Sequence, residues 1–425
     1  MRNILKLFLA ASFLCIYGFI GCSQPPKAIP KWEDFVTPGG SQNNQDNKNN
    51  QDNQDNQDNQ DNQDNQDNKD NKDNQDHNEI LSSTDMVLIY GGGHHRSPYS
   101  WSKDMMKDYV VYTDKSNKSH WLFDSFLLLE FMDPAVNGGP GKTLVTGYKY
   151  KGSYMQSANK DDWGRLIDYY CSKDSGAGAI DKAVGDAKVI LGEPASARTI
   201  VVGIPEPITC LYSATHSGGT SYWGEINGEQ LDFSNRTDRV RACKWYVDKV
   251  VEKFKAMKYK NIKLAGFYWV AEQSGDTKDM LFDLAAYINS NNYSFNWIPY
   301  YRAAGYADWR SYGFNFAYLQ PNYFFNKDVP YERLNSACAE AELAGMDMEL
   351  EFDDNALVRY GRGYKLRDYM KAFKEHGVWK NRRLAYYQGG WSVRSLKNSS
   401  DPQDNQLYHD FCDFVISRPI RDKHK

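Results

Sequence analysis

Several common signatures are missing from this 425-residue sequence. No two of its seven cysteines have CxxC spacing, which argues against a zinc site. The glycine run Gly91-Gly92-Gly93 leads into two histidines, and neither it nor any later turn matches a GxGxxG or P-loop pattern. The chain therefore shows no sign of a zinc protein or of a nucleotide-phosphate site. The five cysteines after residue 80 allow a single disulfide in an oxidising compartment, but their spacing does not pair them.

The sequence also lacks a basic arm. The formal net charge is −4, and the stretch 41–78, with ten aspartates and three lysines, contributes −7 of it, so the remainder carries about +3. The acidity belongs to that stretch, and the rest of the chain is nearly neutral. Without a strongly positive region, nucleic acid is not the expected partner.

The first 22 residues resemble a secretory signal. Arg2 and Lys6 precede an apolar run, Leu7–Ile20, which ends at Gly21-Cys22. A cysteine in this position resembles the lipobox of bacterial lipoproteins, in which the peptide is cut before the cysteine and the sulfur carries lipid. The alternatives are an ordinary secretory signal and a membrane anchor, although the run is short for a span. We expect a lipoprotein signal over 1–22, with lipidated Cys22 anchoring the protein at the surface of a bacterial outer membrane.

Residues 23–80 contain very few apolar side chains. Four prolines lie within Ser23–Gly40, and a tract built on Gln-Asp-Asn follows from about Gln42 to Asn78. Such a composition cannot bury enough apolar surface to offset the entropy of ordering. It predicts a disordered tether between the membrane and a folded domain.

Residues 81–425 alternate strand-like and helix-like segments. Eight near-continuous apolar strands, each followed by a helix, predict an α/β fold of the (β/α)8 TIM-barrel type, with an open doubly wound sheet as the alternative. The expected strands are Asp85–Gly91, Phe123–Phe131, Arg198–Pro205, Lys263–Glu272, Phe295–Tyr301, Phe314–Gln320, Met346–Asp353 and Arg383–Gln388. The expected helices are Asp161–Cys171, Arg239–Met257, Lys278–Asn289, Glu332–Leu343, Lys365–Lys374 and Asp404–Ile416. Within Leu211–Phe233, the dipeptide Asn227-Gly228 predicts a small hairpin.

The acidic residues of the fourth and seventh strands suggest an active site. In such barrels the active site lies at the carboxyl ends of the strands, where Glu272 would meet Glu349 and Glu351. On the seventh strand, acidic residues alternate with apolar ones, so the acidic set should face the barrel lumen. Two carboxyls across a cleft are the minimal machinery of a glycosidase. We expect Glu272 to be the acid/base and a seventh-strand glutamate the nucleophile. We prefer Glu349 to Glu351, but the register at the strand end remains open. The alternatives are that Glu272 is an exposed loop carboxylate and that the seventh strand is a solvated edge strand.

The other strand ends offer amides, charges and aromatic rings, a set that suits the hydroxyls and C–H faces of sugars better than a lipid or a phosphate. His94 and His95 are adjacent, a spacing that does not predict a metal site. Trp269, Tyr323 and Trp391 fit a core role equally well. The expected substrate-binding residues are His94, Arg96, Glu206, Trp269, Tyr300, Arg302, Gln320, Asn322, Tyr323, Asp353, Gln388 and Trp391.

Four stretches carry a family resemblance: MVLIYGG, FDSFLLL, GFYWVAE and GMDMELEFDD. With them, the chain from Asp85 to about Trp391 resembles a family of bacterial lipoprotein barrels known as domain of unknown function 4855. The glutamates at the ends of strands four and seven also resemble those of clan-A retaining glycoside hydrolases. The resemblance implies a barrel that works on carbohydrate at a cell surface. Clan-A enzymes usually have an asparagine directly before the strand-four glutamate, where this chain has Ala271.

Three functions follow as alternatives. The first is a retaining glycoside hydrolase of the cell surface that needs no cofactor or metal and acts as a monomer on a polysaccharide or glycan. The second is a non-catalytic glycan-binding lipoprotein on a degenerate barrel, which Ala271 and the tether also suit. The third is a structural surface protein whose barrel lumen is plugged.

Overall fold

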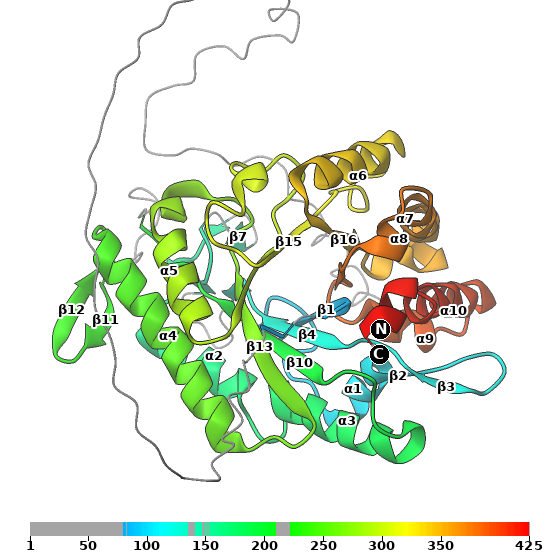
Figure 1. Ribbon diagram of the computed structural model, residues 1–425, viewed down its shortest axis with the longest axis horizontal. Coiled ribbons are helices and arrows are strands. Elements are labelled where there is room, and N and C mark those ends of the chain that lie inside the picture. The colour runs from blue at the N-terminus through cyan, green and yellow to red at the C-terminus, as the bar shows by residue number, and fades with distance from the viewer. Residues whose placement is uncertain are drawn as a thin grey trace, which may run out of the picture. The chain divides into compact units, whose positions relative to one another are not determined.

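Eight parallel strands form a closed barrel in the computed structural model (Figure 1), which describes residues 80–81, 83–134, 141–146, 149–150, 153–209 and 222–424. The strands follow one another in the order β1-β17-β16-β15-β14-β13-β10-β4, and β1 pairs with both β17 and β4. Closure leaves no edge strand, and helices surround the barrel. The predicted TIM barrel is therefore confirmed. The predicted signal peptide, Cys22 and all but the end of the predicted tether lie outside the described residues.

The barrel strands are β1 (Asp85–Tyr90), β4 (Ser125–Leu129), β10 (Arg198–Ile204), β13 (Ile262–Trp269), β14 (Ser294–Trp297), β15 (Phe316–Leu319), β16 (Asp347–Glu351) and β17 (Leu384–Tyr387). The short strands are β2 (Val111–Thr113), β3 (Ser119–Trp121), β5 (Met132–Asp133), β6 (Lys142–Thr143), β7 (Lys149–Tyr150), β8 (Ser153–Tyr154), β9 (Gln156–Ser157), β11 (Tyr222–Ile226) and β12 (Glu229–Asp232). The α-helices are α1 (Lys103–Val110), α2 (Lys160–Tyr170), α3 (Gly176–Leu191), α4 (Arg236–Met257), α5 (Lys278–Ser290), α6 (Glu332–Ala344), α7 (Gly363–Glu375), α8 (Val378–Asn381), α9 (Ser392–Lys397) and α10 (Pro402–Ile416).

The predicted hairpin is present as the β11–β12 pair. Its strands are antiparallel, and the turn between them contains Asn227 and Gly228, both at positive φ. The pair extends from the barrel beside α4 (Figure 1), with Trp223 buried against Trp163 of α2. The hairpin is therefore anchored by an aromatic contact at its base.

Helix α3 did not follow from the sequence because three glycines weaken its helical pattern. Close backbone contacts require two of them. A Cβ at Gly176 would lie 2.4 Å from the Tyr169 carbonyl oxygen, and one at Gly178 would lie 2.3 Å from the Lys173 carbonyl oxygen. The buried face of small residues, including Ala183, lets α3 approach its neighbours closely. Tertiary packing here overrides local helix propensity.

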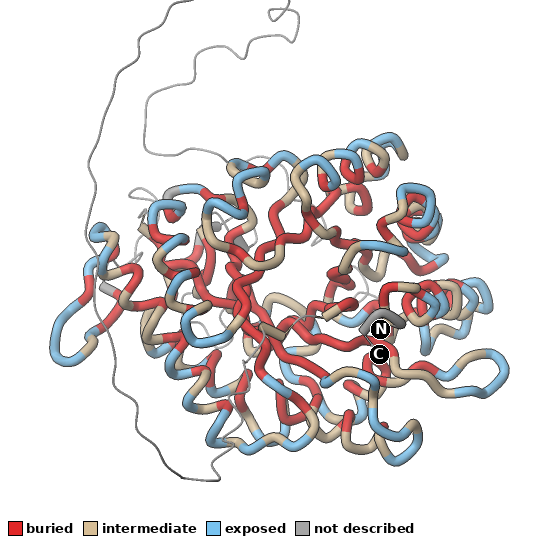
Figure 2. Tube along the Cα trace, in the orientation of Figure 1, coloured by how far each residue is buried: buried red, intermediate tan, exposed pale blue. Residues whose placement is uncertain are grey.

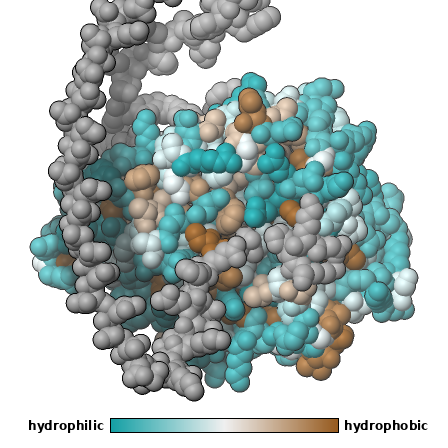
Figure 3. All heavy atoms as spheres, viewed as in Figure 1, coloured by the Kyte–Doolittle hydropathy of each residue, from teal (hydrophilic) through white to brown (hydrophobic). Residues whose placement is uncertain are grey.

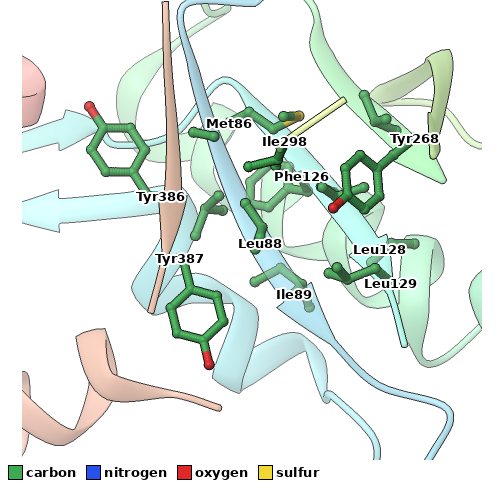
Figure 4. Close-up of a cluster of buried hydrophobic side chains, with 14 of the residues drawn as sticks. Met86, Leu88, Ile89, Phe126, Leu128, Leu129, Tyr268, Ile298, Tyr386 and Tyr387 are labelled. Carbon is green, nitrogen blue, oxygen red and sulfur yellow. The ribbon is translucent and has the colours of Figure 1, made fainter. Parts of the chain in front are cut away.

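The barrel interior is a packed core. Figure 2 shows buried strands at the centre, with exposed residues on the outer faces of the helices. Met86, Leu88 and Ile298 lie together inside the barrel, and Tyr386 and Tyr387 lie on opposite sides of β17 (Figure 4). The face of the molecule in Figure 3 is mostly hydrophilic, with small separate groups of hydrophobic residues.

A buried ion pair joins the C-terminal segment to the start of β1. Arg418 donates to a carboxylate oxygen of Asp85, and both side chains are fully buried. Arg421 and the hydroxyl of Tyr386 also bond to Asp85. The nearby cations and hydroxyls outweigh burial and lower the pKa of Asp85. The network lies at the amino end of the strands, opposite the predicted site, so its role is structural.

Candidate active site

The seventh barrel strand, β16, turns its acidic residues toward the lumen. Glu349 is in register with Ala385 of β17, and Glu351 is in register with Tyr387. Phe352 points the other way, because its ring lies 5.0 Å from that of Phe411 on α10. Side chains alternate along a strand, so Glu349 and Glu351 face the barrel interior. Both are completely buried.

Glu272 comes to the same end of the barrel from β13, three residues beyond the strand end. The negative charges of Glu351 and Glu272 both raise the pKa of Glu349, in addition to the larger effect of burial. The charge of Glu272 also raises the pKa of Glu351. The fold therefore gathers three carboxyls into one electrostatically coupled group, here called the carboxyl cluster (Glu272, Glu349 and Glu351).

Two hydrogen-bond donors hold Glu351. The Tyr369 hydroxyl and the Asn322 backbone N–H both donate to its Oε2, the latter at 2.7 Å. These donors favour the ionised form, although burial still raises the pKa of Glu351 above its usual value. Oε1 of Glu351 and both oxygens of Glu349 have no hydrogen-bond partner of good geometry in the part of the chain that the structure describes. Glu349 thus lacks the support that Glu351 has for a negative charge, and burial together with the charges of Glu351 and Glu272 holds its pKa well above its usual value.

Glu272 keeps some exposed surface, although protein surrounds most of its carboxyl. Burial raises its pKa to about 7, against smaller opposing effects of Gln320 and the Arg96 charge. The Gln320 side-chain amide donates to Oε1 of Glu272 at 3.3 Å. Near neutral pH this carboxyl exists in both protonation states, as a group that donates and then accepts a proton requires.

Aromatic rings and one guanidinium border the cluster. Arg96 lies over the rings of Tyr90 and Tyr387, at 5.3 and 5.4 Å from their centroids. Burial raises the pKa of Tyr90 and of Tyr268, and the Glu272 charge adds to both shifts. The sequence analysis did not select these three tyrosines. Tyr90 and Tyr268 were nevertheless detectable, because each falls in the inward-facing set of its strand by period-two spacing.

A histidine–carboxylate pair lies at the neighbouring strand ends β1 and β4. Nδ1 of His95 lies 3.2 Å from Oε1 of Glu130, which also accepts the Phe131 N–H at 2.8 Å. Gly93 permits this approach, since a Cβ there would lie 2.7 Å from the Glu130 side chain. The sequence analysis missed Glu130, whose only signal was its position just after a buried strand.

Several predicted binding residues lie at the cluster or close to it. Gln320 and the Asn322 backbone bond to it directly. Tyr300 donates from its hydroxyl to Gln273 at 3.0 Å, and its backbone N–H bonds to the Glu272 carbonyl. Asp353 accepts from Asn355, and the nearby Arg96 charge opposes the burial that raises its pKa.

Other predicted residues are engaged elsewhere. Gln388 is completely buried and bonded to Tyr109 and to backbone carbonyls. Tyr323 donates to Asp368 of α7, and Arg302 pairs with Glu340 of α6. The remaining four are placed as follows: Trp269 is buried in the core, Glu206 accepts the Thr146 N–H at 2.7 Å, His94 bonds to Asp133, and Trp391 is 38% exposed.

Helix α7 supports the cluster from outside the barrel. Lys365 Nζ donates to the carbonyls of Tyr323, Asn326 and Val329, and its ammonium lies 3.7 Å from the Tyr323 ring centroid. Tyr369, one turn later on the same helix, bonds to Glu351. One helix face therefore fixes both the segment after β15 and a cluster carboxyl, an arrangement that no strand pattern could indicate.

Four further findings concern the described residues alone. They contain no group of three or more side chains that could hold a metal ion. None of their helices has the length and apolar character needed to span a membrane. The cysteines among them, Cys171, Cys243, Cys338 and Cys412, are buried free thiols. A hollow of about 170 Å³ lies beside Cys338 and His376, against the amino end of β16 and away from the carboxyl cluster.

The fold defines a (β/α)8 barrel with a cluster of carboxyls at the carboxyl end of its strands. The chain belongs to the family described as "Domain of unknown function (DUF4855)", which matches residues 85–413. No curated protein matches the chain significantly.

Similar solved structures include a protein of Bacteroides thetaiotaomicron provisionally described as an alpha-L-fucosidase, with 13% identity, 79% of this chain and 95% of that chain covered, and a TM-score of 0.40. A GH18 chitinase from Pseudoalteromonas aurantia has 10% identity, coverages of 74% and 96%, and a TM-score of 0.35. A mutant tryptophan synthase alpha-subunit from Pyrococcus furiosus has 6% identity, coverages of 78% and 98%, and a TM-score of 0.35. At such TM-scores these likenesses carry no weight for the activity of this chain.

Proposed function

We propose that this barrel is a retaining glycoside hydrolase that acts on a polysaccharide or glycan. The supporting observation is the carboxyl cluster, in which Glu272 from β13 meets Glu349 and Glu351 from β16. Opposed carboxyls with raised pKa values suit the protonation of a glycosidic oxygen and the stabilisation of an oxocarbenium-like transition state. The amide of Gln320 supplies a hydrogen-bond donor of the kind that a sugar requires.

In this proposal Glu272 is the acid/base. With a pKa of about 7, it can protonate the leaving oxygen and later remove a proton from the attacking water. The nucleophile is Glu351 rather than Glu349, which the sequence analysis preferred. Tyr369 and the Asn322 backbone favour an ionised Glu351, whereas neither oxygen of Glu349 has a hydrogen-bond partner of good geometry among the described residues. Attack by Glu351 forms a glycosyl ester as the leaving group departs with the proton of Glu272, and water then hydrolyses the ester.

A screen of host and plant polysaccharides for reducing-sugar release tests this function. Glu272→Gln should lower turnover by roughly 10²–10⁴-fold, the range of general acid–base catalysis, while glycan binding survives. Glu340→Gln is the matched control, because Glu340 lies on α6 and pairs with Arg302 rather than with the carboxyl cluster. Unchanged turnover in Glu272→Gln would rule out the assignment. The anomeric form of the first product, observed by NMR, separates retention from inversion.

A second candidate function is glycan capture without cleavage. It is favoured by the complete burial of Glu349 and Glu351, and by Ala271, which stands where clan-A enzymes usually have an asparagine. Here Glu272, the one member of the cluster that keeps some exposed surface, would bind the glycan through hydrogen bonds. Tight binding on a glycan array, with no sugar released from any bound glycan, would favour capture over hydrolysis.

We further propose that the protein acts as a monomer tethered to the outer membrane through lipid on Cys22, with the stretch 23–80 as a flexible spacer. The support is the sequence of residues 1–22 and the polar composition of the tract that follows. Labelled fatty acid should be incorporated into the wild-type protein and not into Cys22→Ala. Protease treatment of intact cells tests surface exposure, and light scattering of the released protein tests its oligomeric state.

A further inference from the structure

Four of the five exposed aromatic side chains in the described part of the chain lie on one sector of the barrel rim. They are Tyr99 after β1, Tyr360 and Tyr364 after β16, and Trp391 after β17, with exposures of 45, 50, 48 and 38%. These three strands are neighbours in the barrel, and all four residues follow their carboxyl ends. The fifth exposed aromatic, Phe282, lies on α5. We call the four residues the aromatic sector.

The segments that carry the sector pack against one another. A Cβ at Gly390 would lie 2.1 Å from the Ser97 carbonyl oxygen, so the segments after β17 and β1 are in backbone contact. The Ser392 hydroxyl lies 2.7 Å from a carboxylate oxygen of Asp354, which joins the segments after β17 and β16. The sector is therefore one supported surface rather than a set of independent loops.

This surface is continuous with the carboxyl cluster. Arg96, next to Ser97 in the chain, lies over Tyr387 of β17, and its charge opposes the burial that raises the pKa of Glu272. A ligand that contacts Glu272 and extends past Arg96 would reach the sector. Arg96 thus links the sector to the candidate active site.

Polar groups accompany the exposed rings. The His94 ring stacks on Tyr99, with centroids 4.4 Å apart and an angle of 19° between the planes, and His94 also bonds to Asp133. The Arg359 guanidinium lies 4.9 Å from the Tyr360 ring centroid. Flat rings beside hydrogen-bonding groups match a sugar, with its C–H faces and peripheral hydroxyls.

We infer that the aromatic sector binds a polysaccharide chain that runs outward from the carboxyl cluster over β1, β17 and β16. This inference rests on the proposed function and narrows its substrate to a polymer, rather than a short glycoside held only at Glu272. Stacked rings at several positions along the rim provide separate sites for successive sugar units.

Affinity electrophoresis tests the inference, with the full chain carrying Glu272→Gln run through gels that contain xylan, mannan, pectin, chitosan or chondroitin sulfate. Tyr99→Ala, Tyr360→Ala and Trp391→Ala should each weaken binding to the retarding polymer by about tenfold, in line with the value of one ring contact. Phe282→Ala is the matched control and should bind as the parent does. The four substituted residues, Tyr99, Tyr360, Trp391 and Phe282, are all exposed, so the folded state should tolerate the changes. Thermal melting of each variant verifies this.

The outcomes separate this inference from the proposed hydrolysis. Sector variants that bind the polymer as tightly as the parent, an equal loss in Phe282→Ala, or no retardation by any polymer would overturn the inference. If cleavage depends on Glu272 while the sector variants bind normally, the proposed hydrolysis is supported and the inference about the aromatic sector is wrong. If no polymer is cleaved but the sector variants lose binding, the inference about the sector is supported and the proposed hydrolysis is wrong.

Discussion

The raised pKa of Glu272 predicts a pH-dependent cost in folding stability that Glu272→Gln should remove. The folded protein holds a proton on this carboxyl up to a pKa of about 7, against an ordinary value of 4.5. Because the folded-state pKa is raised, the stability contribution is fully present below pH 4.5 and is lost as the pH rises toward 7. Glutamine resembles the protonated carboxyl, so the variant should match the wild type near pH 4 and exceed it at pH 7.5.

The size of this effect follows from the same pKa. The full difference corresponds to about 3 kcal/mol, and about 2–3 kcal/mol remains after allowing for solvent screening of a partly exposed group. A folded region of roughly 330 residues unfolds with an entropy near 0.7 kcal/mol per kelvin. The variant should therefore melt about 3–4 °C above the wild type at pH 7.5. Calorimetry from pH 4 to 8 measures the difference directly.

A control variant isolates the effect of the cluster. Glu340→Gln removes a carboxylate on α6 that pairs with Arg302. This variant should show no comparable stabilisation at pH 7.5. A constant difference between Glu272→Gln and the wild type across this pH range would refute the reasoning, as would a loss of stability at pH 7.5. Either result would mean that Glu272 ionises freely in the folded protein, and the proposed acid/base role would lose its physical basis.

Three further substitutions test contacts of Glu351, Asp85 and Glu272. Tyr369→Phe removes a donor to Glu351 and should raise the pKa of that carboxyl further, shifting the acidic limb of a pH–rate profile upward and costing about 1–2 kcal/mol in denaturant unfolding. Arg418→Met leaves Asp85 buried with a weakened counter-charge and should destabilise the fold by about 3–5 kcal/mol, visible as a lower denaturant midpoint. Gln320→Leu removes the amide that bonds to Glu272 and should raise the pKa of that carboxyl, measured by NMR titration.

The barrel was predictable because each strand is buried on both faces and therefore appears in the sequence as an apolar run. The boundaries of the strands were less predictable. The strand expected to continue to Tyr301 ends as β14 at Trp297, because Pro299 cannot donate a ladder hydrogen bond. Alternating residues on β16 likewise predicted which side chains face inward, and register with β17 agrees.

The surroundings of the cluster were not predictable to the same degree. Tyr369 reaches Glu351 from helix α7, and no strand pattern connects the two residues. Gln388 follows a strand end, as a site residue would, yet its amide is fully used by Tyr109 and backbone carbonyls. Position at a strand end thus selects the right region of the fold, whereas the partners of each side chain depend on packing between distant segments.

Ala271 illustrates why the cluster must be judged from its contacts rather than from one sequence position. Clan-A enzymes usually supply an amide from the residue before the strand-four glutamate. Here the alanine side chain supplies none, and its carbonyl accepts the Trp297 indole N–H at 2.7 Å. An amide nevertheless reaches the cluster from the end of β15, because Gln320 donates to Glu272 and also opposes the burial that raises the pKa of Glu349. If glycan binding depends on an amide beside Glu272, substitution of Gln320 should abolish that binding. The protein should be active with Ala271 in place, so Ala271→Asn should not be needed for activity.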